Sequence, residues 1–363
     1  MKIIHCADIH LDSPMNTNFD EATADSLRAG LIKAFKEMAD YAVTCGAEAI
    51  IIAGDLFDRT RVSAFARREV EAVIKGHPDI VFYYLQGNHD NGAFLMGLKE
   101  IPDNLRTFSG EWTVYEQGEK VRIYGVELSR ENSADIYGSL ETDRDSFNIV
   151  VLHGQTENHK VNNRAESINL NGLKNRGIDY LALGHIHSYI EAPLDKRGIY
   201  CYPGCLVGRG FDEPGAHGFV VLDIDESTGS LKTERVYSSA PGIYVTRVDV
   251  TDLKNDDAIA TAVGEVLEAD GVKEESLIRV TLFGSLDEEY EPNREYIRQL
   301  LLDSYPHLRL EDSIHYETDY RKYEKDISLK GEFIRTVMDD DELTGQERTA
   351  IIRMGLKALL GEL

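Results

Sequence analysis

Apolar and polar positions in the first part of the chain follow two alternating periods. Runs rich in β-branched and other apolar side chains stand at 2–7, 49–53 and 80–85, and each run predicts a buried strand. Apolar residues recur at every third or fourth position over 21–45, which predicts a helix, and a second helix is expected over 63–75. This order of elements is typical of parallel strands joined by helical crossovers.

The pattern changes after Asp90. Short alternating strands, such as 112–115 and 121–126, are separated by glycine and charged turns, and they predict a mixed sheet or a sandwich. Two further runs, 217–224 and 230–237, have the spacing of a β-hairpin that closes a first domain.

A Ser-Ser-Ala-Pro-Gly segment at 238–242 reads as a linker to a second domain. The elements expected after it are strand, helix, strand, helix and strand, over 243–250, 256–269, 277–283, 293–304 and 308–316. The sequence therefore predicts a small β-α-β-α-β domain.

The last residues carry two apolar stripes at helical spacing. Thr344-x-x-Glu347 is a capping box that opens the second of these helices. The stripes need a partner surface, which is either this protein itself or another protein. We predict a first domain over 1–240, a small domain over 241–325 and a helical tail over 326–363.

The charge balance is strongly acidic, with 64 acidic and 39 basic residues and a net charge of −25. From Thr251 onward there are 27 acidic and 14 basic residues, a net of −13, so the surplus is densest there. A protein that wraps nucleic acid unaided needs a basic surface, and this composition argues against that class. With its acidic balance, the small domain is expected to act as a cover or spacer.

The basic residues that remain in the first domain are the candidates for phosphate contacts. Arg59 and Arg61 are preferred because they follow Asp55 on the same loop. The other candidates are Arg67, Arg68, Lys160, Arg164, Arg197 and Arg209.

Cysteine content and hydropathy indicate the cellular compartment in which the protein is expected. The four cysteines, Cys6, Cys45, Cys201 and Cys205, show no disulfide framework. No stretch approaches the roughly 20 apolar residues that span a bilayer. We expect a cytoplasmic protein that does not bind membranes.

Candidate chemistry stands where the predicted strands end. Five strands run directly into ligand-type side chains: Asp8 and His10; Asp55; Asn88, His89 and Asp90; His153; and His185 and His187. The carboxyl ends of parallel strands meet at one rim of a sheet, so these side chains are expected to converge.

The donor set indicates a metal site. Oxygen ligands mixed with imidazoles suit Mn²⁺, Fe or Zn²⁺ better than Ca²⁺, which prefers oxygen throughout, or structural Zn²⁺, which favours thiolates. With His89 set aside, the remaining ligands are too many for one open site. A pair of metals about 3.5 to 4 Å apart that shares Asp55 fits better. We expect Mn²⁺, with Fe, Zn²⁺ and Mg²⁺ as alternatives.

The ordered motifs D-x-H, G-D, G-N-H-D, H and G-H-x-H resemble those of the calcineurin-like metallophosphoesterase superfamily. Within it, the chain is similar to the bacterial SbcD and Mre11-type DNA repair nucleases, especially the branch that begins H-x-A-D-x-H-L-D-S-P. The resemblance implies an α/β (α+β) fold class, with a four-layer β-sandwich flanked by helices, and a small capping domain.

The same resemblance divides the site residues into roles. One metal would be held by Asp8, His10, Asp55 and His187, and the other by Asp55, Asn88, His153 and His185. His89 would sit over the scissile phosphate, with Asp90 orienting its ring.

Two positions depart from the SbcD and Mre11 pattern. Cys205 stands where a Y-P-G-S segment has serine, and Asp12 follows Leu11 where those proteins commonly carry glycine. The second departure points to the H-L-D-S-P branch, whose substrate the resemblance does not fix.

Three functions follow from these observations. The resemblance implies a DNA exonuclease or endonuclease of DNA repair. It would act with an SbcC- or Rad50-like coiled-coil ATPase, onto which the tail would dock. The resemblance also allows the protein to form a homodimer. A phosphatase or cyclic-nucleotide phosphodiesterase on the same metals is the alternative. A binding subunit with a structural metal site is the third, and the completeness of the ligand set argues against it.

Overall fold

The computed structural model describes residues 1–15, 21–58, 62–90, 92–133, 135–157, 167–287, 290–317, 323 and 325–360. Its contacts divide the chain into two compact units, Met1–Gly242 and Ile243–Leu363. Among the helices of the described ranges, none combines the length and the apolarity that a bilayer crossing requires.

The first sheet of unit 1 has the strand order β14-β13-β1-β2-β3-β4. Its strands are β1 (Lys2–Cys6), β2 (Ala47–Ala53), β3 (Val81–Leu85), β4 (Leu105–Thr107), β13 (Gly218–Asp225) and β14 (Ser230–Tyr237). Strands β1 to β4 pair in parallel, while β13 runs antiparallel to β1 and β14. The predicted parallel start and the predicted hairpin are both confirmed.

The second sheet has the order β11-β12-β10-β7-β6-β5. Its strands are β5 (Thr113–Gln117), β6 (Val121–Gly125), β7 (Phe147–His153), β10 (Tyr180–Gly184), β11 (Ile190–Pro193) and β12 (Ile199–Tyr202). The four central strands are parallel and the edge strands β5 and β11 are antiparallel, so this is the expected mixed sheet.

The two sheets pack face to face over one apolar core. Ile51 and Tyr83 of the first sheet share that core with Ile149 and Tyr180 of the second. Helices α1 (Glu21–Cys45) and α2 (Ala64–Gly76) bury their apolar stripes against the outer face of the first sheet.

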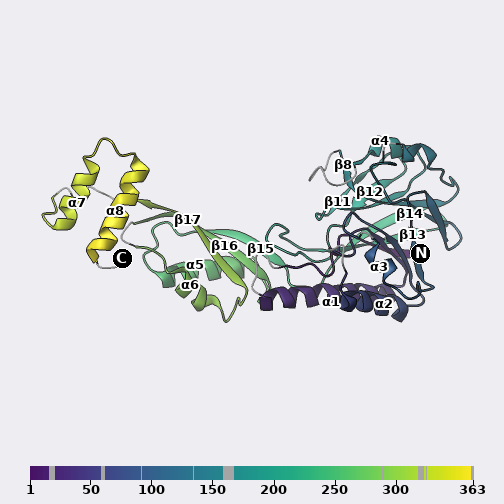
Figure 1. The fold of residues 1–363 in the computed structure, drawn as a ribbon, viewed down its shortest axis with the longest axis horizontal. Coiled ribbons are helices and arrows are strands. Elements are labelled where there is room, and N and C mark those ends of the chain that lie inside the picture. Colours follow the sequence, from purple (N-terminus) through teal and green to yellow (C-terminus); the bar gives the residue numbers. More distant parts are fainter. Residues whose placement is uncertain are drawn as a thin grey trace. The chain divides into compact units, whose positions relative to one another are not determined.

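The short helices η1 (Ile136–Ser139) and α4 (Leu170–Leu173) cover the outer face of the second sheet. Figure 1 shows α1 and α2 along one side of unit 1 and α4 on the opposite side. The predicted four-layer α/β sandwich is confirmed. The remaining short elements of this unit are α3 (Ala93–Met96), β8 (Gln155–Thr156) and β9 (Ser167–Ile168).

Unit 2 contains the parallel sheet β15-β16-β17. Its first elements are β15 (Ile243–Asp249), α5 (Asp256–Ala269), β16 (Leu277–Asp287), α6 (Arg294–Leu301) and β17 (Leu308–Glu317). Ile259 and Val263 of α5 and Ile297 of α6 share a buried core with the sheet. This is the predicted β-α-β-α-β order, with α6 shorter and β16 longer than the sequence indicated.

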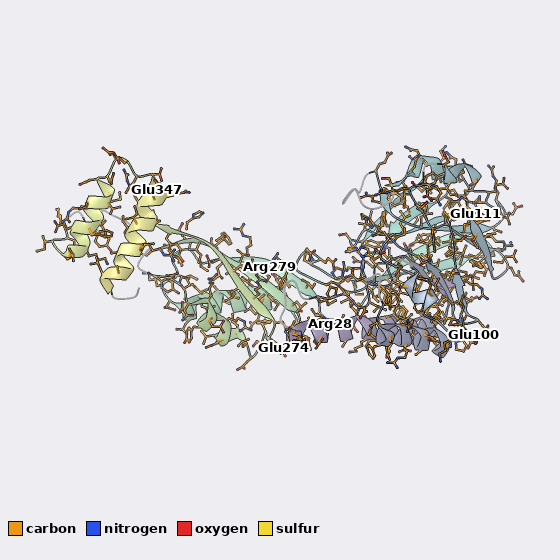
Figure 2. The ribbon with its side chains drawn as sticks, in the orientation of Figure 1. Arg28, Glu100, Glu111, Glu274, Arg279 and Glu347 are labelled. Carbon is orange, nitrogen blue, oxygen red and sulfur yellow. The ribbon has the colours of Figure 1, made fainter. Side chains whose placement is uncertain are left out.

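Two helices follow in unit 2, α7 (Leu329–Met338) and α8 (Gly345–Leu360). The capping box forms as predicted: the amide of Thr344 donates to Glu347 at 2.8 Å, and the amide of Glu347 donates to the Thr344 hydroxyl at 3.3 Å. Glu347 lies in the first turn of α8 (Figure 2). Apolar residues of α7 and α8 pack on one another in a small core of their own. The division of this unit into a capping domain and a tail stays a prediction.

Candidate metal centre

The predicted site residues follow five strands that lie at the centre of the two sheets. β1, β2 and β3 are neighbours in the first sheet, and β7 and β10 are neighbours in the second. The chain turns sharply at several of these ends, and Asp8, His10, Asp55 and His185 have φ angles of 50°, 50°, 52° and 101°. Left-handed backbone is costly for residues other than glycine and clusters at functional sites. Strained backbone at these four residues therefore helps to position the candidate ligand side chains.

Close approach of the two sheets explains a glycine beside the ligands. A Cβ at Gly184 would lie 1.9 Å from the carbonyl oxygen of Ala53 and 2.8 Å from Nδ1 of His153. Only glycine leaves room here for the end of β10 to approach the end of β2.

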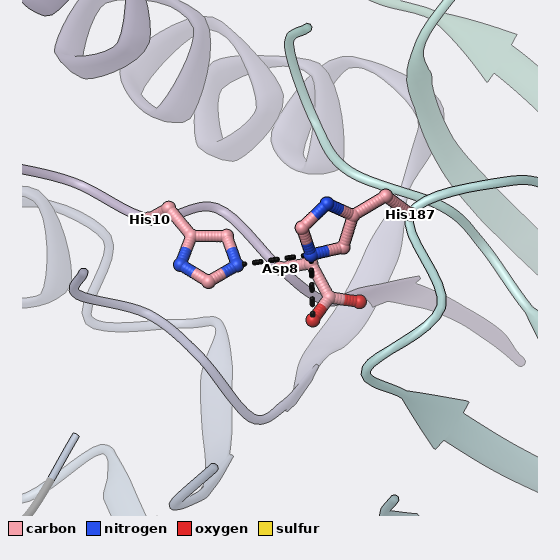
Figure 3. Close-up of side chains that lie close together, drawn as sticks. All are labelled: Asp8, His10 and His187. Atoms are coloured by element: carbon pink, nitrogen blue, oxygen red, sulfur yellow. Dashed lines mark hydrogen bonds and ion pairs between the residues drawn. The ribbon is translucent and has the colours of Figure 1, made fainter. Parts of the chain in front are cut away.

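The first group of ligand atoms belongs to Asp8, His10 and His187, and these atoms lie within 4.8 Å of one another. Nε2 of His10 lies 3.2 Å from Nε2 of His187, which in turn lies 3.9 Å from Oδ1 of Asp8 (Figure 3). The backbone amide of His185 donates to both oxygens of Asp8, at 3.0 and 2.9 Å. The Asp8 carboxylate is thus held in place between the two sheets.

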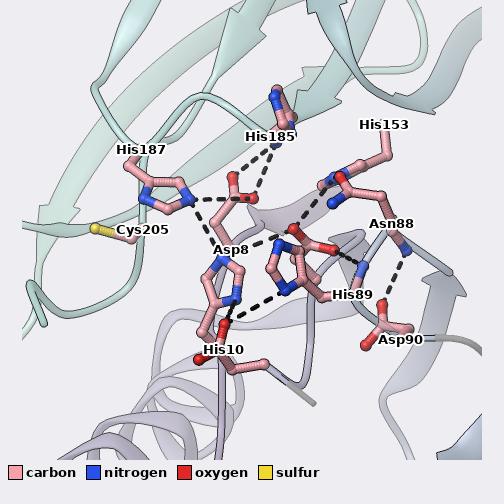
Figure 4. Close-up of polar contacts among 12 residues, drawn as sticks. Asp8, His10, Asn88, His89, Asp90, His153, His185, His187 and Cys205 are labelled. Carbon is pink, nitrogen blue, oxygen red and sulfur yellow. Dashed lines mark hydrogen bonds and ion pairs between the residues drawn. The ribbon is translucent and has the colours of Figure 1, made fainter. Parts of the chain in front are cut away.

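The second group consists of Asp55, His153 and His185, whose ligand atoms also lie within 4.8 Å of one another. Nε2 of His153 lies 3.4 Å from Oδ2 of Asp55 and 3.1 Å from Oδ1 of Asn88. The same oxygen of Asp55 lies 3.7 Å from Nε2 of His10, so Asp55 stands between the two groups. Figure 4 shows the labelled members of both groups together. All seven predicted ligands converge.

The orientation of the rings tests whether these residues fit metal ions. Nδ1 of His10 lies 3.1 Å from Asp58, and Nδ1 of His187 lies 2.6 Å from Glu213. The Nδ1 proton of His187 is directed at Glu213, which leaves its Nε2 lone pair facing Nε2 of His10, while Nδ1 of His10 has no hydrogen-bond partner in the described part of the chain. A cation between the two Nε2 atoms would stabilise this arrangement. Nε2 of His185 is buried and has no hydrogen-bond partner among the described residues. The donor set therefore fits divalent cations.

Burial and charge set the protonation of the metal-free site. Burial alone would raise the pKa of Asp55, but His153 outweighs it and holds that pKa well below its ordinary value. Burial lowers the pKa of His185 to about 4, and the charge of His153 adds to the effect. Burial raises the pKa of Asp8, although His187 opposes the shift. A neutral His185 thus stands beside an Asp55–His153 ion pair, and neutral imidazole is the metal-binding form.

His89 stands apart from the buried ligands. Its side chain is 44% exposed, and its Nδ1 lies 3.5 Å from Oδ1 of Asp58. The ring of His10 meets it edge to face, with centroids 5.2 Å apart. An exposed imidazole at the mouth of a buried site is accessible to a substrate.

Asp90 has contacts that differ from the predicted ones. Its carboxylate accepts the backbone amides of Leu56, Phe57 and Gly87 at 3.3, 2.9 and 2.9 Å. Burial, with the nearby charge of Asp55, raises the pKa of Asp90 to about 7. These bonds tie together two loops of the site. The geometry gives Asp58, in place of Asp90, the position from which to orient the His89 ring.

Sequence reasoning missed Asp58 and Glu213. Asp58 follows Asp55 by three residues in Gly54-Asp55-Leu56-Phe57-Asp58, and this spacing was the available signal. Glu213 lies in the irregular segment after β12, where no periodic pattern marks it.

The arginine candidates have different outcomes. Arg59 and Arg61 lie outside the described residues. Arg197 donates to Asp179 at 2.9 Å and to two backbone carbonyls, so it has a structural role in the second sheet. The Arg209 guanidinium forms ion pairs with Asp58 and Glu213, at 3.3 and 2.8 Å. These contacts occupy the guanidinium that was expected to meet phosphate.

A cavity of about 430 Å³ opens beside the second group of ligands. Its lining combines polar and apolar side chains: Gln86, Gly87, Asn88, Gly92, Met96, Glu127, Leu128 and His153. Gln86 donates to Glu127 at 2.8 Å, so one wall is hydrogen-bonded and acidic. The cavity is of a size that holds a small organic group next to the ligands.

Comparison with known proteins gives one family and several relatives. The family model of calcineurin-like phosphoesterases matches residues 1–189. The uncharacterised metallophosphoesterase YhaO of Bacillus subtilis is 28% identical over 270 residues, which cover 70% of this chain and 64% of YhaO. The DNA double-strand break repair protein Mre11 of Archaeoglobus fulgidus is 26% identical over 231 residues, which cover 57% of this chain and 50% of that protein. The chain thus spans less than two thirds of the length of either relative.

Two solved structures align with part of the chain. TT1561 of Thermus thermophilus aligns with a TM-score of 0.40 at 15% identity, covering 64% of this chain and 98% of that one. A dimetal phosphatase from Danio rerio aligns with a TM-score of 0.40 at 11% identity, covering 61% of this chain and 92% of that one.

Proposed function

We propose that this chain, which belongs to the calcineurin-like phosphoesterase family, hydrolyses phosphodiester bonds of DNA. Family membership makes it a metal-dependent phosphoesterase, and the DNA substrate is the finer part of the proposal. The observation that carries the proposal is the convergence of seven oxygen and nitrogen ligands in two groups, with Asp55 between them. The similarity to an Mre11 protein of DNA double-strand break repair supports DNA as the substrate.

The ligands divide according to the two groups. Asp8, His10 and His187 would hold one divalent ion, Mn²⁺ by preference, and Asn88, His153 and His185 the other, with Asp55 shared. When bound, such a pair supplies an activated water and neutralises charge on the phosphate oxygens. The side chains themselves fix the ligand positions, because backbone and carboxylate contacts orient several of them before an ion arrives.

His89 is the residue that we assign to the leaving oxygen. Its exposed ring can donate a proton or a hydrogen bond to that oxygen as the phosphorus–oxygen bond breaks. Oδ1 of Asp58 lies 3.5 Å from Nδ1, so Nε2 is the ring nitrogen directed away from the carboxylate. The reaction needs no covalent intermediate, and burial raises the pKa of the Cys205 thiol far above the range of a nucleophile.

A phosphatase or cyclic-nucleotide phosphodiesterase is the second candidate. The net charge of −25 disfavours a long polyanion as the substrate. The cavity of about 430 Å³ beside Asn88 and His153 suits a small leaving group. Both observations favour a small phosphoester, and the substrate comparison below separates the two functions.

A coiled-coil ATPase of the SbcC or Rad50 type is the partner that we propose for α7 and α8. Ile334 and Val337 of α7 pack against Ile352 and Leu356 of α8, so part of each apolar stripe is buried within the tail. Large apolar side chains remain exposed on the same two helices: Leu329, Ile351, Met354 and Leu359. Such a surface fits a helix-in-groove contact. Co-purification of the chain with such an ATPase, lost in a Leu329→Asp/Met354→Asp variant, would support this partner.

The function is tested by comparing substrates. Purified protein with Mn²⁺ is assayed on bis(p-nitrophenyl) phosphate, p-nitrophenyl phosphate and linear DNA. The proposal predicts cleavage of the diester and of DNA, with little action on the monoester. A strong preference for the monoester would reject the nuclease function. Undetectable hydrolysis with every divalent metal tried, with or without the ATPase, would favour a structural metal site.

A further inference from the structure

A loop packs behind the site at His187. After β12 the chain turns at Gly204, whose φ is +79°, and the amide of Cys205 donates to the carbonyl oxygen of His187 at 3.1 Å. A Cβ at Gly204 would lie 2.8 Å from that same oxygen. The segment 203–217 is therefore built against the backbone of His187.

The same segment contacts the His187 ring through Glu213. Oε1 of Glu213 lies 2.6 Å from Nδ1 of His187, and the Glu213 side chain is 10% exposed. The carboxylate also accepts Nη2 of Arg209 at 2.8 Å and the Arg209 amide at 2.9 Å. Nε2 of His217 donates to the Glu213 backbone carbonyl at 2.9 Å. Glu213 is thus held from several sides while it meets the ring.

Arg209 connects Glu213 to a second carboxylate. Its Nη1 lies 3.3 Å from Oδ1 of Asp58, the oxygen that lies 3.1 Å from Nδ1 of His10. Ser13 donates to the other Asp58 oxygen at 2.8 Å. Nη2 of Arg209 also lies 3.2 Å from Nδ1 of His187, and because a guanidinium cannot accept, the Nδ1 proton goes to Glu213. One partly buried cation, Arg209, therefore bridges the carboxylates that lie behind two different site histidines.

The second group of ligands, Asp55, His153 and His185, is oriented by other contacts. Nδ1 of His153 is 2.9 Å from the carbonyl oxygen of Ala53, so this ring is oriented by the end of β2. Its Nε2 faces Asn88 and Asp55. The described contacts of Arg209 and Glu213 lie on the side of His187 and His10.

We propose that Arg209 and Glu213 are positioning residues that orient His187 and His10 for one of the two metal positions, and we call the pair the rear clamp. The inference rests on the proposed function, because it takes the metal pair as given. A ligand imidazole that donates its other nitrogen to a carboxylate is fixed in ring orientation and tautomer, and it is a stronger ligand for that reason. Loss of the clamp should weaken the position of Asp8, His10 and His187 and spare that of Asn88, His153 and His185.

The test measures metal binding directly. Mn²⁺ affinity and stoichiometry are determined for the wild type, Glu213→Gln, Arg209→Met and the conservative Glu213→Asp by calorimetry and elemental analysis. The expected result is a second Mn²⁺ weakened by about 10- to 100-fold in the first two variants, with one ion still bound as in the wild type. Glu213→Asp should recover part of the loss, because it keeps the charge.

Electron paramagnetic resonance supplies a signature that a general loss of stability would not give. The wild type loaded with two equivalents of Mn²⁺ should show a spin-coupled pair, and Glu213→Gln should show a mononuclear signal at the same loading. Arg197→Met is the matched control, since it breaks another arginine–carboxylate pair, with Asp179 at 2.9 Å. This control should keep the coupled pair.

Three outcomes would overturn the clamp. Two ions bound by Glu213→Gln as tightly as by the wild type would contradict it, as would equal weakening of both ions. A wild type that binds fewer than two ions would overturn the proposed metal pair and the clamp with it, and this result is distinguished from the others because it appears before any substitution. Should Arg209→Met fail to fold in a melting curve, Glu213→Gln, which keeps the shape of the side chain, decides alone.

Discussion

The carboxylate of Asp58 lies 3.5 Å from Nδ1 of His89, while Asp90, the next residue after His89, turns its carboxylate to three backbone amides. The residue that is adjacent in sequence is therefore bound to the loop backbone, and the residue that faces the imidazole comes from the loop after β2. This relationship separates a role in catalysis from a role in holding the loops, and the two can be tested independently.

Asp58→Asn should lower turnover. The amide cannot stabilise a protonated His89 as the carboxylate does, so kcat is expected to fall by about 100-fold. Steady-state kinetics on a phosphodiester with saturating Mn²⁺ measures this change. An unchanged kcat would show that Asp58 has no part in positioning His89.

Asp90→Asn should act on stability instead. The new amide group would direct hydrogens at backbone donors, so a bond to Leu56, Phe57 or Gly87 is lost, at about 1–3 kcal/mol. Thermal or urea unfolding of the metal-free protein measures the loss. A variant with wild-type stability and greatly reduced kcat would return the orienting role to Asp90.

His89→Ala should abolish cleavage with both metals still bound. The ring is 44% exposed, and its ligand atom groups with those of His10 and Asp58, apart from the two groups to which His187 and His153 belong. Elemental analysis beside the activity assay checks both halves of the prediction. Loss of a metal in this variant would make His89 a ligand and would contradict its assigned role.

Metal uptake should release protons near neutral pH. Burial alone would lower the pKa of His153, but Asp55 and Asp8 reverse the effect and raise it to about 9. A metal needs the neutral ring, so affinity should rise with pH up to about 9 and be weaker at pH 6. Calorimetry at about pH 7 in two buffers of different ionisation enthalpy counts the protons released. No dependence on the buffer would contradict the prediction.

The raised pKa of His153 also makes the stability of the metal-free protein depend on pH. Because the folded pKa of His153 is raised, its contribution to stability is full below the ordinary value near 6.5 and is lost as the pH rises through about 9. Melting temperatures should therefore fall over this window without metal. Saturating Mn²⁺ should reduce that dependence, since the bound ring no longer carries the proton.

The sequence predicted the long elements well because they have strong periods. Helix α1 has the predicted bounds, Glu21–Cys45, and the strands predicted over 49–53 and 80–85 are placed to within two residues, as β2 and β3. The single-turn helices α3 and α4 were missed, since four residues are too few for a period of 3.6 to appear.

The candidate site was predictable where ligands follow strands. Asp8, Asp55 and His185 each follow a parallel strand, and the topology alone brings those ends to one rim. Asp58 and Glu213 were not found, because their importance depends on which ring nitrogen each loop reaches in three dimensions. The position of Asp90 was misjudged for a related reason: adjacency to His89 in the chain does not turn its carboxylate toward that ring.

Anomalous diffraction at the manganese edge, from a crystal soaked in Mn²⁺, tests the dinuclear centre most directly. We expect two peaks about 3.5 to 4 Å apart, one among Asp8, His10 and His187 and one among Asn88, His153 and His185, with Asp55 reaching both. A single peak, or peaks too far apart to share Asp55, would contradict it.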